Sequence, residues 1–449
     1  MQPLLRPARG ADRSIGAVRR LTTAVGALLA ASAVFAGAGN ADAARVLVVD
    51  GNGHAAVRVD PTIPAESPFE RPLPGPVQPS PAADGPVAAA AGASRLEGAI
   101  RAAAASGAIG AATRSEYLRV VARARSTARR VGGSRRAAIN AVIANFSRMS
   151  LSASRLRPAI ETVRRNAQWF GSNGAGGWGG RVTFKDSWLV WQFYPGQGLQ
   201  VQWLGSFGRL NGLYLSKSRD SKLREMAREM ASMAVERAGG VAWEYMFQFG
   251  GGRPPWVSAI SQGTALQSLA RAGDRLRERD LLRVADRALG IFRTAPPTGI
   301  RVRTSRGAHY LGYSYAPGQR IYNQFFQGLI GLHDYARLAD DGGARRLFLE
   351  GERQARVEVR QSDSGSWSYY QPGEYSTLDY HKLLRDFVRG LCDRLRADRE
   401  QAASRLRERQ GPDAVLRDFG DYPDPAPYCI TTQRFYDYLY QRMGRTNPN

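Results

Sequence analysis

The chain repeats one pattern four times, a loop of aromatic residues, Pro and Gly that leads into an apolar segment with helical spacing. The loops are FYPGQ at 193–197, PPWVSAISQG at 254–263, YSYAPGQ at 313–319 and WSYYQPGEYSTLDY at 367–380. Aromatic faces suit the apolar side of sugar rings, and a tyrosine hydroxyl transfers protons where neighbouring cations lower its pKa. These residue types indicate a carbohydrate cleft with proton-transfer chemistry.

Motifs for other chemistries are missing from the sequence. It has no nucleophile elbow, P-loop or dinucleotide fingerprint. Its two cysteines, Cys392 and Cys429, are too few for a zinc site, and its four histidines show no ligand spacing. We therefore expect neither a metal nor a cofactor. The two cysteines could pair in an oxidising compartment.

The segments that follow the loops predict a repeated pair of helices. The loops start about 60 residues apart, the length of a helical hairpin with its connections. Each apolar segment precedes a more charged one, as 264–273 precedes 279–292. Such pairs form an α/α toroid when they close on themselves, and a linear solenoid when they do not. We favour the toroid, because its inner helices point their positive N-terminal ends into one cleft that suits an anionic ligand.

The composition points to an anionic partner outside the cytosol. The 449 residues carry a net charge of +24, nearly all of it from arginine, although a GC-rich genome also enriches arginine. Arg19-Arg20 precede a Gly- and Ala-rich apolar run, and Ala41-Asp42-Ala43 forms a small-x-small cleavage pattern. We expect a signal peptide, a secreted or cell-envelope protein and no transmembrane segment in the mature chain. An uncleaved N-terminal anchor is the alternative.

Changes in composition divide the chain into five parts. We predict a signal peptide at 1–43, a β-hairpin and Pro/Ala-rich linker at 44–92, a helical region at 93–170, a mainly α toroid domain at 171–400 and a C-terminal extension at 401–449. Short β-strands are expected at the cleft, where residues 182–192 and 241–249 are rich in aromatics. In the helical region, the apolar residues that share one face are Ile139, Val142, Ile143 and Phe146.

The loop sequences also resemble a known family, the C-terminal domain of D-glucuronyl C5-epimerases. The resemblance lies in PPWVSAISQG, in FYPGQ and in YSYAPGQRIYNQFFQGLIGLHDY at 313–335. It continues in Ser364-Gly365 and in Asp379-Tyr380-His381, so that it covers about residues 175–395 in the family's order. The resemblance implies an α/α toroid that inverts C5 of hexuronate residues in an acidic polysaccharide.

The resemblance further implies the residues that move protons. A base removes the C5 proton, an acid returns one on the other face, and neutralisation of the adjacent carboxylate stabilises the carbanion. The tyrosines that match the family's motifs are Tyr313, Tyr369 and Tyr380. Gly312 stands where the family has a glutamate, so we expect another carboxylate to act as base. Glu244, in the aromatic stretch before the PPWVSAISQG loop, is our candidate.

Six further residues are candidates for binding the substrate. A tryptophan at the mouth could stack on sugar, a basic residue could pair with the uronate carboxylate, and polar residues at the helix starts could contact hydroxyl groups or cap the helices instead. A histidine there could transfer protons or simply pack. The candidates are Trp256, Arg320, Lys185, Gln262, Asn323 and His381.

Two other functions fit the same fold. A polysaccharide lyase also begins by removing the C5 proton, and a hydrolase needs two carboxylates across the cleft, for which only Glu244 with Glu374 or Asp379 is available. A glycan-binding protein that has lost its base is the non-enzymatic alternative, favoured by Gly312. Nucleic acid is not expected as a partner, because the chain carries an export signal and no basic helix motif.

Overall fold

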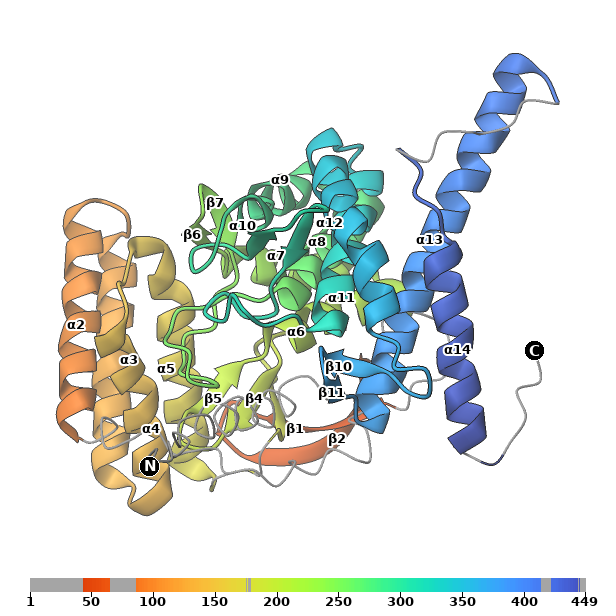
Figure 1. The fold of residues 1–449 in the computed structure, drawn as a ribbon. Helices are drawn as coiled ribbons and strands as arrows, with labels where there is room; N and C mark the ends of the chain where they lie inside the picture. Colours follow the sequence, from red (N-terminus) through yellow and green to blue (C-terminus); the bar gives the residue numbers. More distant parts are fainter. Residues whose placement is uncertain are drawn as a thin grey trace, which may run out of the picture.

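The computed structural model describes residues 43–64, 86–174, 176, 179–412, 421–442 and 444. The predicted signal peptide therefore lies outside the described residues, apart from Ala43. Figure 1 shows a layer of N-terminal helices at one side, helical hairpins through the centre and a small sheet below them. Along the described residues, no helix combines the length and the apolarity needed to cross a membrane.

A five-stranded sheet lies against the lower end of the central helices. Its order is β2-β1-β3-β4-β5, with β1 and β3 parallel and the other neighbours antiparallel. The strands are β1 (Ala43–Val49), β2 (Ala55–Pro64), β3 (Arg181–Phe184), β4 (Trp191–Tyr194) and β5 (Gly198–Val201). β1 and β2 form the predicted hairpin. β3 and β4 lie at the two ends of the aromatic stretch 182–192, whose middle is not a strand, and β5 follows that stretch. In the second stretch, 241–249, only the first two residues are in a strand.

Four helices form the N-terminal layer. They are α2 (Pro86–Ala105), α3 (Ala111–Arg130), α4 (Gly133–Asn145) and α5 (Ala153–Ser172), and a 3-10 turn, η2 (Phe146–Arg148), follows α4. All four residues expected on one face, Ile139, Val142, Ile143 and Phe146, are buried. α2 begins inside the stretch interpreted as linker, because Ala89, Ala93, Leu96 and Ile100 already form a buried stripe at helical spacing.

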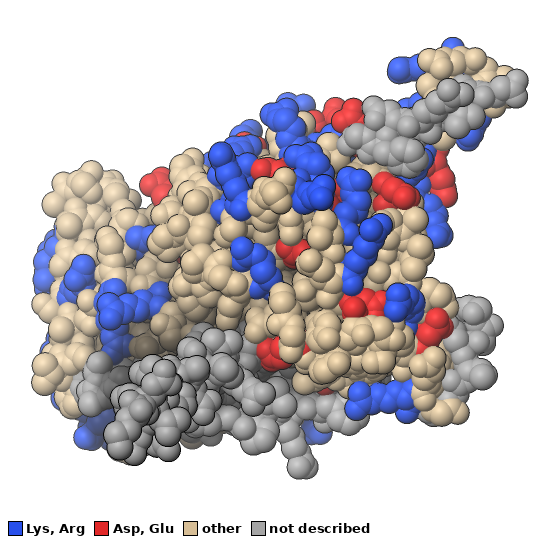
Figure 2. All heavy atoms as spheres, viewed as in Figure 1, with Lys and Arg blue, Asp and Glu red and all other residues tan. Residues whose placement is uncertain are grey.

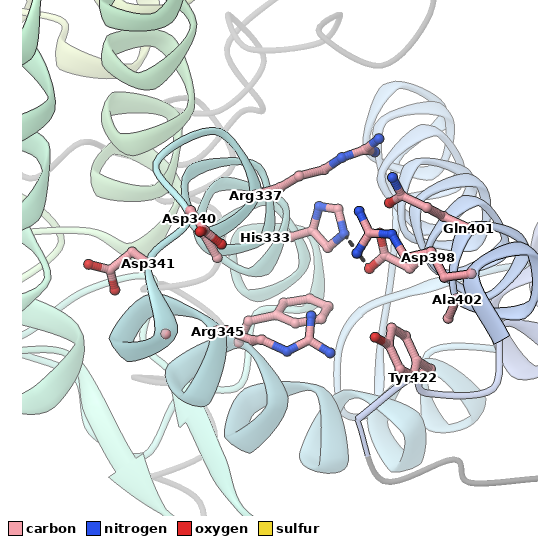
Figure 3. A pocket seen from close by; sticks show the side chains of 13 residues that line it. His333, Arg337, Asp340, Asp341, Arg345, Asp398, Gln401, Ala402 and Tyr422 are labelled. Atoms are coloured by element: carbon pink, nitrogen blue, oxygen red, sulfur yellow. Dashed lines mark hydrogen bonds and ion pairs between the residues drawn. The ribbon is translucent and has the colours of Figure 1, made fainter. Parts of the chain in front are cut away.

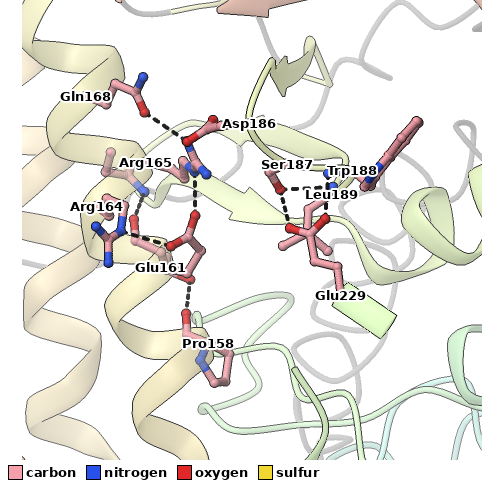
Figure 4. A network of polar contacts seen from close by, with 12 residues as sticks. Pro158, Glu161, Arg164, Arg165, Gln168, Asp186, Ser187, Trp188, Leu189 and Glu229 are labelled. Carbon is pink, nitrogen blue, oxygen red and sulfur yellow. Dashed lines mark hydrogen bonds and ion pairs between the residues drawn. The ribbon is translucent and has the colours of Figure 1, made fainter. Parts of the chain in front are cut away.

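An ion pair and two hydrogen bonds hold the N-terminal layer and the central helices to the loop after β3 (Figure 4). The buried Arg165 of α5 donates to Glu161 on its own helix at 2.5 Å and to Asp186 at the end of β3 at 2.7 Å. On the other side, the carboxylate of Glu229 accepts from the Ser187 hydroxyl at 2.6 Å and from the Trp188 amide at 2.7 Å. The loop after β3 is thus fixed between α5 and α7.

Four helical hairpins follow in the order that the sequence predicted. The inner helices are α6 (Trp203–Leu215), α8 (Ala259–Leu276), α11 (Tyr322–Leu338) and α13 (Leu378–Gln410). The outer helices are α7 (Asp220–Ser232), α9 (Arg279–Ala288), α12 (Gly342–Gln361) and α14 (Ala426–Arg442), and the short α10 (Gly290–Arg293) follows α9. Two-stranded ribbons join them: β6 (Val235–Arg237) with β7 (Gly240–Ala242), β8 (Arg301–Arg303) with β9 (Ala308–Tyr310), and β10 (Tyr369–Gln371) with β11 (Glu374–Tyr375).

The inner helices pack side by side in an arc. α8 packs between α6 and α11, and α11 packs between α8 and α13, with an outer helix behind each. The α8–α11 contact is so close that a methyl group on Gly331 would overlap the backbone of Gly263. Four hairpins in an arc form an incomplete α/α toroid, which confirms the predicted mainly α fold.

The far ends of α11 and α13 border a cleft of about 330 Å³, which Figure 3 shows from close by. His333 of α11 crosses this end to reach Asp398 of α13. A disulfide between Cys392 and Cys429 joins α13 to α14. This pairing, which the sequence left open, fixes the C-terminal extension to the last inner helix.

Candidate functional site

The loops before the inner helices meet in one buried group of aromatic side chains, which we call the tyrosine cluster. In Figure 1 this region lies at the lower ends of α6 and α11, between β4 and β10. Its members are contributed by β4, the segment after β7, the two central loops, β10 and the start of α13: Tyr194, Tyr245, Trp256, Tyr313, Tyr315, Tyr370 and Tyr380. The predicted convergence of the loops is therefore observed.

The first half of the tyrosine cluster surrounds the start of α6. Gln202, the N-cap of α6, accepts hydrogen bonds from the backbone amides of Leu204 and Gly205. Its amide group also donates to the Tyr194 hydroxyl and accepts from the Tyr245 hydroxyl, both at 3.3 Å. Tyr245 stacks on Trp256 with ring centres 4.2 Å apart. One helix cap thereby orients two phenols.

The second half surrounds the start of α11. Tyr313 lies 5.6 Å from Trp256 and 5.4 Å from Tyr315, measured between ring centres. Its hydroxyl accepts a hydrogen bond from Nε2 of Gln324 at 3.3 Å. Tyr370 lies 4.8 Å from Tyr380, at the N-terminal end of α13. Three of the four loops thus contribute to this half of the cluster.

Several buried polar atoms near the start of α11 have no hydrogen-bond partner among the described residues. Such atoms are uncommon in folded proteins, where water or a ligand usually satisfies them. They are the hydroxyl groups of Tyr315, Tyr370 and Ser376, the side-chain oxygens of Gln319 and Gln324, and both polar atoms of the Asn323 amide. All are uncharged, as expected of a surface that contacts sugar hydroxyl groups.

Burial dominates the electrostatics of the tyrosine cluster. It raises the pKa of Tyr194, Tyr245, Tyr313 and Tyr370, so these phenols are protonated at neutral pH. Two charges act within the cluster. The buried Arg181 of β3 works against the raised pKa of Tyr194, and the carboxylate of Glu374 in β11 raises the pKa of Tyr370 further. A cation and a carboxylate therefore act on different tyrosines of one cluster.

Part of the chain is similar to known proteins. The family model of the D-glucuronyl C5-epimerase C-terminus matches residues 238–400. Over this segment the chain is similar to the D-glucuronyl C5-epimerase C-terminal family. A D-glucuronyl C5-epimerase of Caenorhabditis elegans is 28% identical over 130 residues, which are 26% of this chain and 21% of that protein. The chain thus aligns with about a fifth of its curated relative.

One solved structure overlaps a larger share of the chain. It is the unsaturated glucuronyl hydrolase of Bacillus sp. GL1, described as responsible for the degradation of glycosaminoglycan. The overlap covers 53% of this chain and 60% of that chain, with 12% identity and a TM-score of 0.34.

The epimerase-family tyrosines do not all lie together. Tyr313 and Tyr380 are in the tyrosine cluster, 2% and 6% exposed. Tyr369 lies outside it, on the outer face of β10, where its ring packs 4.9 Å from that of Tyr375. The neighbouring Tyr370 is the buried member of the pair, because successive residues of a strand point to opposite faces.

The candidate base Glu244 has a different environment from the one that we expected. Its side chain is fully buried and accepts hydrogen bonds from Arg155 of α5 and from Arg237 of β6. Two guanidinium groups therefore neutralise this carboxylate between the N-terminal layer and the β6–β7 ribbon. The following residue, Tyr245, turns into the tyrosine cluster. Glu374 is the carboxylate whose charge acts on a cluster tyrosine.

Three of the candidate binding residues use their polar side-chain atoms in hydrogen bonds to other parts of the protein. Trp256 is buried at the centre of the tyrosine cluster, and its indole N–H donates to the Phe247 carbonyl. The amide of Gln262 bonds the backbone of Trp243 in both directions. His381 stacks on Trp367 and hydrogen-bonds Ser368 and Phe435, and burial lowers its pKa to about 4.

The other three candidates differ in how they relate to the site. Asn323 lies in the first turn of α11, buried beside Gln324, with both polar atoms of its amide unpartnered among the described residues. Arg320 donates to the carbonyls of Pro317 and Gln319 within its own loop. Lys185 is exposed at the end of β3. Arg181, at the other end of the same strand, was missed, because a single arginine before a strand has no distinctive sequence signal.

Proposed function

We propose that this protein inverts C5 of hexuronate residues in an acidic polysaccharide. The observation that carries the proposal is the tyrosine cluster, in which an epimerase-family segment and the β3–β4 region bring phenols, an arginine and a carboxylate together. The epimerase-family match and the named relative support the reaction type.

The reaction needs a base, an acid and a cation. The base breaks the C5–H bond, and the electron pair moves into the neighbouring carboxylate as an enolate. The acid then gives a proton to C5 on the opposite face, so protons and electrons balance without an oxidant. A fixed positive charge beside the substrate carboxylate stabilises the enolate.

The cluster offers a group for each role. Burial keeps Tyr313 protonated, so we assign it as the acid. Tyr370 is the candidate base, because burial and the charge of Glu374 raise its pKa and so make its phenolate a strong base once the proton has left. Arg181 is the cation. The unpartnered amide of Asn323 and hydroxyl of Tyr315 are suited to the sugar hydroxyl groups.

The surface charge favours a polymeric anion over a small one. Figure 2 shows Lys and Arg side chains over the face formed by α9 and α12, with fewer acidic groups between them. The net charge of +24 attracts polyanions over a range that salt shortens.

We further propose that the protein is exported. The Arg19-Arg20 pair, the apolar run and the Ala41-Asp42-Ala43 pattern support a cleaved signal peptide. The disulfide between Cys392 and Cys429 supports an oxidising compartment. N-terminal sequencing of protein recovered from the cell envelope or medium tests this, and a mature chain that still carries the apolar run would contradict it.

Incubation of the purified protein with hexuronate polymers in D2O tests the reaction. Deuterium at C5 with unchanged chain length is the expected result. Unsaturated chain ends would indicate a lyase, and new reducing ends without unsaturation would indicate a hydrolase. Binding of the polymer without any of these changes would leave a glycan-binding protein.

A further inference from the structure

The side chain of Gln324 fills the space beside Gly312 that a side chain at position 312 would need. A side chain on Gly312 would overlap the carboxamide oxygen of Gln324, which reaches back from the first turn of α11. Gly312 is not among the residues with positive φ, so its backbone would accept a side chain. The neighbouring carboxamide, and not the backbone, therefore requires a glycine here.

The carboxamide of Gln324 that fills this space contacts a tyrosine that we assign to proton transfer. Its side chain is fully buried, and its Nε2 donates to the Tyr313 hydroxyl at 3.3 Å. It also acts on Tyr370, where it opposes the rise in pKa that burial causes. Its oxygen has no hydrogen-bond partner among the described residues. One carboxamide thus lies between two of the phenols that we assign to proton transfer.

We propose that Gln324 is the positioning residue of the reaction centre, that it occupies the place of a side chain at position 312, and that its carboxamide makes Tyr313 a proton donor. The catalytic part of this inference rests on the proposed function, and the structural part does not. Because Nε2 donates to the Tyr313 oxygen, the Tyr313 proton must point elsewhere, towards the substrate. A carboxylate in the same place would accept that proton and make Tyr313 part of a base.

The shared space is tested by a double-mutant cycle in thermal stability. Gly312→Ala is expected to lower Tm when Gln324 is present, because the new methyl group overlaps the carboxamide. In a Gln324→Ala background the same substitution should cost little, so that the double variant melts no lower than Gln324→Ala alone. An equal decrease in Tm in both backgrounds would contradict the claim that a side chain at position 312 and the Gln324 carboxamide need the same space. This outcome does not depend on whether the protein is an enzyme.

The role of the carboxamide is tested by Gln324→Glu, which has nearly the same shape. The rate of deuterium exchange at C5, plotted against pH, should show an additional transition at the pH where the introduced carboxyl ionises. Gln327→Glu is the matched control, since Gln327 is also buried in α11 but its amide donates to Thr264, away from the cluster. The control should lose stability without acquiring the additional transition.

The pH dependence of hexuronate affinity, measured by calorimetry, keeps this test independent of turnover. In Gln324→Glu the affinity should fall as pH rises through the pKa of the new carboxyl, and in wild type and Gln327→Glu it should not. Identical profiles in Gln324→Glu and the control would overturn the positioning role. If the wild-type protein neither exchanges the C5 proton nor binds hexuronate, the proposed function is refuted. The double-mutant cycle in Tm would still test whether a side chain at position 312 overlaps Gln324.

Discussion

Arg155 holds Glu244 through two parallel hydrogen bonds, from Nε at 2.7 Å and from Nη2 at 2.8 Å. Arg237 adds a third at 2.6 Å. Because the Glu244 side chain is fully buried, its charge depends on these partners. We therefore predict that Arg155→Ala lowers the free energy of unfolding by about 1–3 kcal/mol, the usual cost of leaving a buried group without its hydrogen bonds, because Arg237 still balances the charge of Glu244. Urea unfolding measures it.

A matched set of variants separates this structural role from a role as base. Glu244→Gln together with Arg155→Met should lose less stability than the sum of the two single changes, because both single changes break the same Arg155–Glu244 pair. Folded Glu244→Gln should retain deuterium exchange at C5. Loss of exchange in a variant that remains folded would restore Glu244 as the base.

Tyr370 and Tyr369 provide a sharp test of which tyrosine belongs to the site. We predict that Tyr370→Phe slows C5 exchange by about 10²-fold or more, the usual contribution of an acid or base group. Tyr369→Phe should leave the rate unchanged, because the ring of Tyr369 packs on that of Tyr375 outside the cluster. Both substitutions remove one hydroxyl group, so equal rates would contradict the assignment.

The same pair shows where the sequence was informative and where it was not. The position of the loop before the last inner helix followed from the repeat, and the loop does reach the cluster. Which of two adjacent tyrosines faces inward depends on the pairing of β10 with β11, whose register shifts between Tyr369 and Gln371. A register set by a partner strand has no local signal in the residues themselves.

The helical framework was predicted because its signals are local. Apolar residues at helical spacing, loops with Pro and Gly, and charged outer segments are each contained within one hairpin. The partners of the buried charged residues could not be predicted from such local signals. The Arg155–Glu244 pair joins residues 89 positions apart, and Arg181 lies in a strand that pairs with β4 and is buried there.

Arg181 and Lys185 allow the cation to be identified. Arg181 is buried and acts on Tyr194, whereas Lys185 is exposed at the opposite end of the same strand. We predict that Arg181→Gln weakens binding of a hexuronate oligosaccharide and slows exchange, because the substrate carboxylate and the enolate lose their counter-charge. Lys185→Gln removes the same formal charge and should change neither. A larger effect at Lys185, measured by calorimetry, would move the carboxylate site to the edge of the sheet.

His333 predicts how stability depends on pH. Burial by itself lowers the pKa of His333, but hydrogen bonds to Asp334 at 3.2 Å and Asp398 at 2.9 Å outweigh burial and raise it. The protonated ring links α11 to α13 beside the cleft of Figure 3. A histidine whose pKa is higher in the folded than in the unfolded state stabilises fully below its unfolded pKa, and this stabilisation is lost as pH rises through the folded pKa.

We therefore expect the free energy of unfolding to fall as pH rises above the ordinary pKa of histidine, and His333→Gln to remove this slope. His381 supplies the opposite sign within the same molecule. Burial lowers its pKa to about 4, so its contribution is lost as pH falls from the ordinary value towards 4. His381→Gln should flatten only the acidic side of the profile. Urea unfolding from pH 4 to 9 measures both, and an unchanged slope in His333→Gln would show that its ring is neutral in the folded protein.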